Sequence, residues 1–337
     1  MTVNMEREIT EPVLLCDKSG NLNYDSVGWA KKPIITANLS GHFLRKKKWN
    51  YWCVFSREAL LSATISHLDY AAVCFIYYLE YETKEFHEKT FIIPFNKDIQ
   101  MPEEILDSVN AMSKDTGIFF IWNNDYMNLK IHCTDFGGAE LKADINIHYP
   151  EDMETLNVIV PWSDKQFQFT AKHHCLPADG SFSIGTKTFS CNPETDFGVL
   201  DFGRGIWPRK STWNWGMASG RQGNDVIGLN FGGKWTDGTG STENAAVRNG
   251  VITKISEDVD FIYNRHDLMQ PWSIQSNQVR LTFEPFYKRT SAFNALAIKS
   301  NMYQIVGHFY GEITLRHDDT LVIDKLLGCI EDHTATW

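Results

Sequence analysis

Trp49-Asn50-Tyr51-Trp52-Cys53-Val54-Phe55 is the stretch of sequence that decides the fold class. Because successive side chains of a β-strand point to opposite faces, the four residues at its odd-numbered positions would share one face, and Trp52 and Val54 would lie on the other. A strand that is apolar on both faces needs packing on both sides, as in a closed barrel with a filled or ligand-holding interior. Residues 74–81 repeat the pattern. The stretch therefore predicts a β-protein with an enclosed interior.

Most of the chain around this stretch has the same character. Runs of aromatic and β-branched residues with a period of two are separated by Gly, Asn, Asp and Ser, which is typical of strands joined by turns. Residues 101–112 differ, because Pro102 lies near their start and Ile105, Leu106 and Val109 follow at helical spacing. We expect a lid or linker helix there. The prediction is an all-β protein with one or two short helices.

Two segments of the sequence echo each other. Lys46-Lys47-Lys48-Trp49-Asn50-Tyr51-Trp52 resembles Arg209-Lys210-Ser211-Thr212-Trp213-Asn214-Trp215, since both place basic residues before a Trp-Asn-aromatic triplet. They lie about half a chain apart, which predicts two related β-units in tandem. Coincidence is the alternative, because the shared motif is short. If the echo is real, we expect an N-terminal β-domain of residues 1–155 and a C-terminal β-domain of residues 156–337.

Length, charge and composition exclude several classes of protein. The chain has 337 residues, about twice the usual length of one domain. With 32 Lys and Arg against 42 Asp and Glu, its net charge of −10 would repel a phosphate backbone, so nucleic-acid binding is not expected. A hydrophobic fraction of 43% excludes wholesale disorder. The 7 cysteines are scattered without a CxxC pair, and we expect buried thiols rather than disulfides or a zinc finger.

The sequence also bears on membranes, location and metals. The first residues carry acids where a signal peptide needs a basic end and an apolar run, so we expect a cytoplasmic protein. Residues 70–79 form the longest apolar run, far short of the roughly 20 residues that span a bilayer as a helix. His173-His174-Cys175 and His317-Asp318-Asp319 would point to alternating strand faces, and no metal site is expected from them.

The segment between Gly198 and Gly250 is the most informative for function. It holds twelve of the 23 glycines, together with Trp207, Trp213, Trp215 and Trp235. Glycine lets a backbone approach a ligand closely and tryptophan supplies a large flat surface, so the pairing favours a pocket wall. The structural alternative is that a barrel needs glycine at its corners and aromatic rings in its core.

Three acids in this segment are candidate catalytic residues: Asp201, Asp237 and Glu243. Asp201 would either hold Arg204 in a buried ion pair or present a carboxyl group of raised pKa at the rim of a pocket. The loop of residues 235–244 would either be a plain turn or deliver Asp237 or Glu243 into a cleft. No Lys or amphipathic helix follows its glycines, so a phosphate cradle is not expected.

Two asparagines on neighbouring predicted strands complete the candidate pocket. Asn214 and Asn230 share their strand faces with small residues. They would either bond across the strands or supply hydrogen-bond donors to a ligand oxygen. With Arg204 and the four tryptophans they form the predicted ligand-binding set, which is Arg204, Trp207, Trp213, Asn214, Trp215, Asn230 and Trp235.

The motifs of this segment resemble a known family. They are Asp201-Phe202-Gly203-Arg204-Gly205-Ile206-Trp207-Pro208 and Thr236-Asp237-Gly238-Thr239-Gly240-Ser241-Thr242-Glu243-Asn244, with Leu281-Thr282-Phe283-Glu284-Pro285 and Glu331-Asp332-His333 later in the chain. Together they resemble a widespread family of domains of unknown function over nearly the whole length. Phe202 departs from the Trp expected there, and residues 74–81 have no known role in the family.

The resemblance implies a fold and a kind of chemistry. The family's tandem architecture is similar to the two-lipocalin superfamily, which includes carotenoid hydratases, tocopherol-cyclase-like proteins and fungal cycloaddition enzymes. This implies two lipocalin-like (calycin-type) antiparallel barrels, or highly curved sheets, around a small and largely apolar molecule. It also implies chemistry without a cofactor, such as hydration, cyclisation or isomerisation.

Our functional hypothesis is a cofactor-independent enzyme acting on an isoprenoid, polyketide or similar hydrophobic molecule. Asp201, Asp237 or Glu243 would be the general acid, because burial raises the pKa of a carboxyl group. The tryptophans would face a developing cation, and the remaining members of the binding set would orient an oxygen. The alternatives are a non-catalytic carrier or sensor of a lipid-like molecule and, third, a carbohydrate-active protein with paired carboxylates. The oligomeric state does not follow from the sequence.

Overall fold

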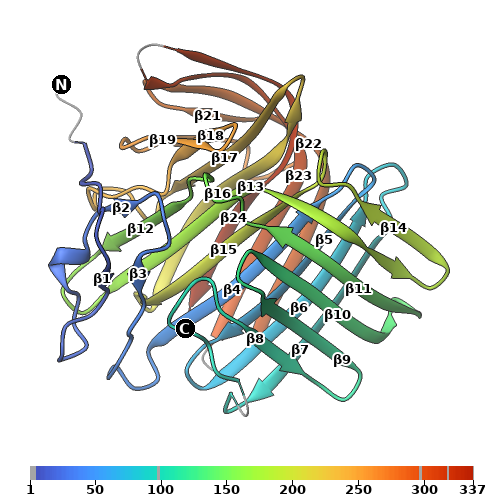
Figure 1. Cartoon of the computed structure of the whole chain (residues 1–337), viewed down its shortest axis with the longest axis horizontal. Coiled ribbons are helices and arrows are strands. Elements are labelled where there is room, and N and C mark those ends of the chain that lie inside the picture. Colours follow the sequence, from blue (N-terminus) through green and yellow to red (C-terminus); the bar gives the residue numbers. More distant parts are fainter. Residues whose placement is uncertain (1–4, 97–98, 296–297, 317–318, 337) are drawn as a thin grey trace.

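The structure is a computed structural model, and it describes residues 5–96, 99–295, 298–316 and 319–336. Nearly all regular elements are β-strands, and they form two large antiparallel sheets that follow one another along the chain. In Figure 1 the first sheet runs from blue to green and the second from yellow to red. The predicted all-β class with two curved sheets in tandem is confirmed.

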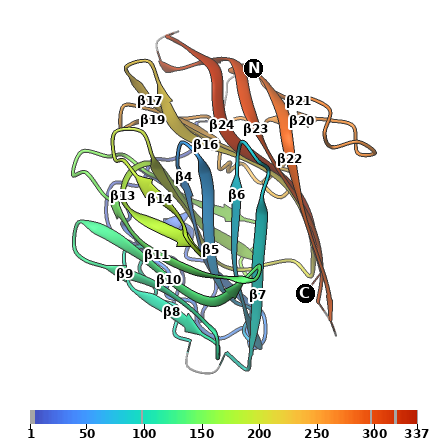
Figure 2. The same cartoon turned by 90° about the vertical axis from the view of Figure 1, so that its right-hand side faces the viewer.

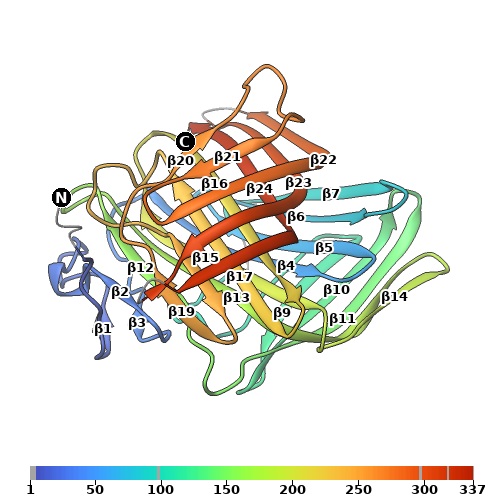
Figure 3. The same cartoon turned by 90° about the horizontal axis from the view of Figure 1, so that it is seen from above.

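The first sheet has the strand order β7-β6-β5-β4-β15-β13-β11-β10-β9-β8. Its members are β4 (Lys46–Phe55), β5 (Ala59–His67), β6 (Ala71–Glu80), β7 (Phe86–Pro94), β8 (Val109–Met112), β9 (Thr116–Trp122), β10 (Tyr126–Phe136), β11 (Ala139–His148), β13 (Phe167–Ile184) and β15 (Phe197–Ile206). Three further strands join at its side, namely β2 (Trp29–Ala30), β12 (Leu156–Pro161) and β14 (Lys187–Cys191). A small parallel pair, β1 (Val13–Leu14) and β3 (Ile35–Thr36), lies with β2 and β12 at one edge of the molecule (Figure 3).

The second sheet has the order β19-β18-β17-β16-β24-β23-β22-β21-β20. Its strands are β16 (Lys210–Gln222), β17 (Asp225–Gly233), β18 (Ala245–Arg248), β19 (Val251–Lys254), β20 (Asp260–Ile262), β21 (Trp272–Gln275), β22 (Val279–Ala295), β23 (Ile298–Thr314) and β24 (Thr320–Thr336). Figure 2 shows its orange-to-red strands as a layer beside the blue-to-cyan strands β4–β7 of the first sheet.

The two sheets share one topology. In each, the first long strand pairs with the next strand and with the last strand of the same sheet, so that β4 lies between β5 and β15 and β16 lies between β17 and β24. The echoed Trp-Asn-aromatic triplets lie in β4 and β16, at corresponding places of the two sheets. The division between the sheets falls at residues 207–209, because the strands between residues 156 and 206 pair into the first sheet.

The predicted helix at residues 101–112 is wrong. Its last four residues form β8, where Val109 pairs with Phe120, and the residues before them are irregular. Ile105 is buried in the core of the first sheet without a helix, so pairing with a neighbouring strand overrides the helical spacing. A 3-10 turn lies at Tyr24–Ser26, and among the described residues no helix is long and apolar enough to cross a membrane.

The core explains why β4 is apolar on both faces. Trp52 and Val54 pack into the cluster enclosed by the first sheet, whereas Tyr51, Cys53 and Phe55 belong to a separate cluster between the two sheets. The alternation predicted from the sequence is therefore confirmed, and the space between the sheets is a second interior. All seven cysteines are buried free thiols, as predicted.

Candidate functional site

The candidate site is a cavity of about 190 Å³ between the two sheets. β4, β5, β6, β13 and β15 form one side of it, and β16, β22, β23 and β24 form the other. Its aromatic lining is Trp49, Tyr51, Phe75, Trp207, Trp213, Trp215 and Trp235, and its charged lining is Lys47, Lys172, Asp201, Glu243, Arg289 and Glu331. Buried charged groups are unfavourable unless they have partners of opposite charge or hydrogen bonds, so several of them in one apolar cavity are unusual.

The tryptophans form a continuous wall at one end of the cavity. Trp207 stacks on Trp235 with a centroid distance of 5.2 Å, and its ring lies 5.6 Å from that of Trp213. Trp215 meets Tyr51 edge to face at 5.8 Å. All four tryptophans that the sequence predicted for ligand binding thus line the cavity.

Lys172 lies at the centre of the charged group. Its Nζ is 2.8 Å from Asp201 Oδ1, 3.2 Å from Glu243 Oε2 and 4.1 Å from the centre of the Trp215 ring. Burial lowers the pKa of Lys172, but the two carboxylates outweigh burial and the net shift is upward. Burial raises the pKa of Glu243, although Lys172 opposes the shift. Two of the predicted acids therefore meet at one buried ammonium group.

The expected ion pair between Asp201 and Arg204 is wrong. The two residues are separated by an odd number of positions in β15, so their side chains point to opposite faces. Arg204 is buried outside the cavity, where it donates hydrogen bonds to the carbonyl oxygens of Pro102 and Trp49 and to Asn50 Oδ1. Asp201 pairs instead with Lys172, which lies opposite it on β13.

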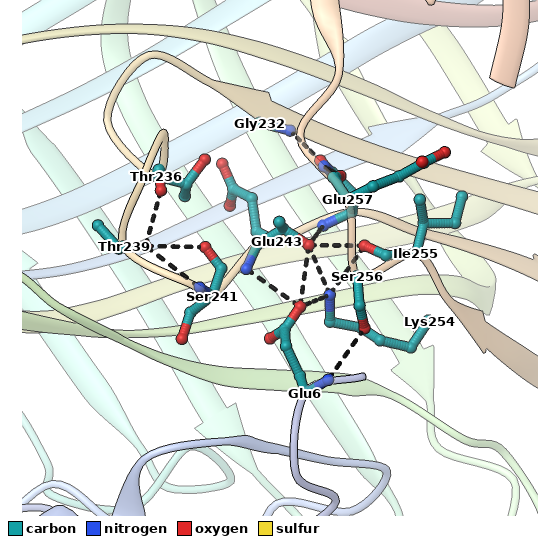
Figure 4. Close-up of polar contacts among 12 residues, drawn as sticks. Glu6, Gly232, Thr236, Thr239, Ser241, Glu243, Lys254, Ile255, Ser256 and Glu257 are labelled. Atoms are coloured by element: carbon teal, nitrogen blue, oxygen red, sulfur yellow. Dashed lines mark hydrogen bonds and ion pairs between the residues drawn. The ribbon is translucent and has the colours of Figure 1, made fainter. Parts of the chain in front are cut away.

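Glu243 lines the cavity and lies in a loop after β17, and Figure 4 shows the polar contacts of this loop. Trp235 Nε1 donates to Glu243 Oε1 at 2.9 Å, and Asn230 Nδ2 donates to the Glu243 carbonyl oxygen at 2.6 Å. Farther along, Glu6 accepts hydrogen bonds from the backbone and hydroxyl of Thr242 and pairs with Lys254, with both charged side chains buried. The N-terminal segment is thereby anchored to this loop.

Asp237, the third predicted acid, lies elsewhere in the loop. Its side chain is exposed, and Oδ1 accepts a hydrogen bond of 2.7 Å from the backbone N–H of Lys234. This is the geometry of a turn that a short polar side chain stabilises. The loop thus brings Glu243 to the cavity and leaves Asp237 at the surface.

The two predicted asparagines lie behind the cavity wall rather than in its lining. Asn230 Oδ1 accepts a hydrogen bond of 2.8 Å from Trp215 Nε1, and Asn214 Nδ2 donates to the carbonyl oxygen of Glu331 at 3.0 Å. Neither pairs with the other in the register of β16 and β17. Each asparagine therefore fixes the position of a residue that does line the cavity.

Glu331 is one of the site residues that our sequence reasoning missed. It is buried in β24, accepts a hydrogen bond of 2.9 Å from Gln304 Nε2, and makes no ion pair with the described residues. Burial raises its pKa to about 7, although the charge of Arg289 and a hydrogen bond from Trp213 oppose the shift. Arg289 itself pairs with Glu88, with Nη2 2.8 Å from Oε1. Glu331 is thus a buried carboxyl group in the cavity whose pKa is raised to near neutral pH.

The echo between the sheets was the signal that could have found Glu331. In the first sheet, Asp201 lies opposite Tyr51, the second aromatic residue of its triplet. In the second sheet, Glu331 lies opposite Trp215, the second aromatic residue of the other triplet. The two acids therefore occupy corresponding positions and reach the same cavity from opposite sides.

The histidine motifs do not form a metal site in the described part of the chain. His174 contacts Ser219 and Asn230, and His173 contacts Tyr149 and Asn157, while burial lowers the pKa of both rings, to about 4 and about 3. Among the residues described, no group of three or more His, Cys, Asp or Glu side chains could hold a metal ion. His317 and Asp318 of the second motif lie outside the described residues.

Gly232 is required where Glu243 lies, and this gives a first prediction. A Cβ at residue 232 would lie 2.1 Å from Glu243 Oε1, so we expect Gly232→Ala to displace the carboxylate from Lys172 and Trp235 and to destabilise the fold by about 1 to 3 kcal/mol. The free energy of unfolding measures this. Gly216→Ala is the matched control, because its Cβ would meet neighbours at 3.6 to 3.7 Å. Equal stabilities of the two variants would show that Glu243 is not held where the structure has it.

Comparison with known proteins gives a family and several remote structures. The model of a family described as "Domain of unknown function (DUF2804)" matches residues 6–337. No curated protein sequence matches the chain significantly.

Three solved structures are similar over most of the chain. They are a Nitrosomonas europaea protein assigned as AttH (10% identity, TM-score 0.48, 87% of this chain and 93% of that one), kievitone hydratase from Nectria haematococca (9%, 0.45, 86% and 88%) and CghA with Sch210972 (8%, 0.41, 86% and 88%).

Proposed function

The chain belongs to the DUF2804 family, whose description names no function, and we propose that its cavity binds a small, largely apolar molecule and converts it by proton transfer without a cofactor. The observation that carries this proposal is a carboxyl group with a pKa of about 7, that of Glu331, inside an aromatic cavity. A group with this pKa is substantially protonated near neutral pH and is matched to general acid catalysis.

The cavity walls support the choice of substrate class. Seven aromatic side chains line a volume of about 190 Å³, which suits a ring or a short unsaturated chain. Aromatic faces attract a cation by about 0.5 to 2 kcal/mol each, so Trp213 and Trp215 would stabilise positive charge that develops on the substrate. We therefore place an alkene or a carbonyl group of an isoprenoid-like or polyketide-like molecule beside these two rings.

The acids divide into two roles in this proposal. Glu331 donates its proton to an alkene carbon or carbonyl oxygen and becomes a carboxylate, which the nearby charge of Arg289 stabilises. In an isomerisation or a cyclisation, the substrate cation then loses a proton to the Glu331 carboxylate. In a hydration, water adds to the cation and the added water loses the proton to Glu331 instead. Glu331 is protonated again at the end of each reaction. Asp201 and Glu243, both paired with Lys172, would position the substrate and stabilise the positive charge that develops on it.

The substrate class is tested by mass spectrometry of the native protein purified gently from its own source, compared with a denatured extract. We expect a bound or loosely held apolar molecule that the protein converts. Recovery of the same molecule unchanged after prolonged incubation would support the alternative of a carrier or sensor. A molecule that is charged throughout would contradict the proposal.

The pH dependence of turnover follows from the pKa of Glu331. Because the protonated form is the donor, we expect kcat/KM to be constant below pH 7 and to fall about tenfold for each pH unit above the pKa of about 7. The profile of the Glu331→Gln variant should lack this limb. A rate that rises with pH through this range would contradict the assignment, because it would require an ionised base.

A further inference from the structure

A second cavity lies at the other end of the space between the sheets. It encloses about 590 Å³. Turns of the first sheet border it, and β16, β22, β23 and β24 form its other side. Along β4 the first cavity contacts Trp49 and Tyr51 and the second contacts Phe55, and the packed Cys53 lies between them. The second cavity is therefore separate from the proposed reaction site, and the proposed function does not use it.

Part of this second cavity is apolar and centres on Phe286. The Phe286 ring lies 6.2 Å from the ring of Tyr81, in the turn between β6 and β7, and 5.3 Å from that of His308. Lys84 Nζ lies 3.8 Å from the centre of the same ring. Phe55 and Leu327 extend the apolar surface. A hydrocarbon chain or ring could pack against this apolar surface along its whole length.

The rim of the second cavity is positively charged in a protein whose net charge is −10. Four cations line it, namely Arg57, Lys84, Arg221 and Lys325, against one carboxylate, Glu284. Within the described ranges no carboxylate forms an ion pair with Lys84 or Lys325, whereas Arg221 faces Glu194 at 3.8 Å. The imbalance favours an anion.

The surroundings of His308 show that two of these cations lie close to the same ring. Burial lowers the pKa of His308, and the charges of Lys325 and Lys84 lower it further, while Glu284 opposes them. Lys84 and Lys325, rather than His308, therefore supply the positive charge at this part of the cavity.

The backbone is irregular at the residues that build this second cavity. The pairing of β22 with β23 shifts register between Pro285 and Tyr287, which leaves Phe286 as the extra residue. The pairing of β23 with β24 shifts between Phe309 and Gly311, and opposite this shift Lys325 has a φ of 56°. Bulges redirect side chains, and a positive φ is unfavourable for lysine. Both irregularities orient a side chain that lines the cavity.

We propose that the second cavity binds an amphipathic carboxylate, with the carboxylate group between Lys84 and Lys325 and its hydrocarbon part on Phe286 and Leu327. Charge at the rim and apolar surface beneath it require both parts in one molecule. A small inorganic anion would not use Phe286, and a neutral alcohol would not use the two lysines. The site is therefore expected to bind the anion of a fatty acid of short or medium length.

Isothermal titration calorimetry with sodium octanoate tests this proposal on the full chain. We expect saturable binding of octanoate and at least tenfold weaker binding of acetate and of octan-1-ol. The Lys84→Met/Lys325→Met double variant should bind octanoate at least tenfold more weakly. Both lysines are exposed, so the variant is expected to fold, and its circular dichroism and melting temperature should match those of the unchanged protein.

Two further variants make the outcome decisive. Lys130→Met/Lys142→Met removes two exposed lysines of the first sheet and should leave octanoate binding unchanged. Glu331→Gln should also leave it unchanged, because Glu331 lines the first cavity. Octanoate binding that survives in the Lys84→Met/Lys325→Met variant but is altered by Glu331→Gln would place the ligand in the first cavity and overturn the proposal. An absence of octanoate binding at millimolar concentration would overturn it as well.

Discussion

Replacing Glu331 with glutamine is expected to lower turnover by roughly a hundredfold to ten-thousandfold while ligand binding persists. Glutamine has nearly the shape of glutamic acid, and its side-chain oxygen can still accept the hydrogen bond that Gln304 Nε2 donates to Glu331. It cannot release a proton to a substrate. Turnover of the molecule recovered by mass spectrometry, measured beside its binding affinity, separates a loss of chemistry from a loss of binding.

Glu312→Gln is the matched control for this experiment. Glu312 lies in β23, is half exposed and pairs with Arg280 at the surface, so its replacement should leave turnover unchanged. Turnover by Glu331→Gln within a factor of two of the unchanged protein would exclude Glu331 as the donor. The same test with Asp201→Asn and Glu243→Gln would then show which of the predicted acids replaces it.

Replacing Lys172 with methionine is expected to destabilise the fold by about 3 to 5 kcal/mol. The side chains of Lys172, Asp201 and Glu243 are 5%, 14% and 2% exposed, so the change leaves two carboxylates buried without their common cation. Breaking a buried ion pair by removing one partner costs far more than the pair itself contributes. The free energy of unfolding by urea, with an unchanged dependence on urea concentration, measures the loss.

A triple variant distinguishes charge from packing in this result. In Lys172→Met/Asp201→Asn/Glu243→Gln no unpaired charge is left, and most of the lost stability should return. Lys142→Met is the surface control, because this lysine is 62% exposed and its loss should change stability by less than about 0.5 kcal/mol. If the triple variant were as unstable as Lys172→Met, the cost would lie in the packing of the lysine stem rather than in its charge.

The fold could be predicted largely from strand periodicity. The two faces of β4 are buried in two different clusters, so large aromatic residues such as Trp52 and Tyr51 occur on both faces and mark the strand in the sequence. The helix expected at residues 101–112 failed for the opposite reason. Its few apolar residues fit a helical spacing, yet Val109 pairs with β9. The spacing of nearby residues cannot predict a pairing with a strand farther along the chain.

The candidate site could be predicted only in part. The tryptophans at 207, 213, 215 and 235 were found because a segment rich in both Gly and Trp is unusual on its own. Lys172 could not be found, because it faces Asp201 only through the register of β13 and β15. Arg204 was predicted to line the pocket because it lies near Asp201 in the sequence. The two residues are three positions apart in β15, so the side chain of Arg204 lies on the opposite face of the strand.

The corresponding positions of Asp201 and Glu331 bear on how such a site evolves. An ancestor made of two identical halves would have held two equal acids facing one chamber, and neighbouring carboxyls of this kind cannot both ionise easily. In the present chain, the residue opposite Asp201 is Lys172 and the residue opposite Glu331 is Gln304. A cation lies beside one acid and a neutral amide beside the other, so the two acids have different electrostatic surroundings. A difference at one pair of corresponding positions would therefore make the two sides of one chamber chemically unequal, as the proposed direction of proton transfer requires.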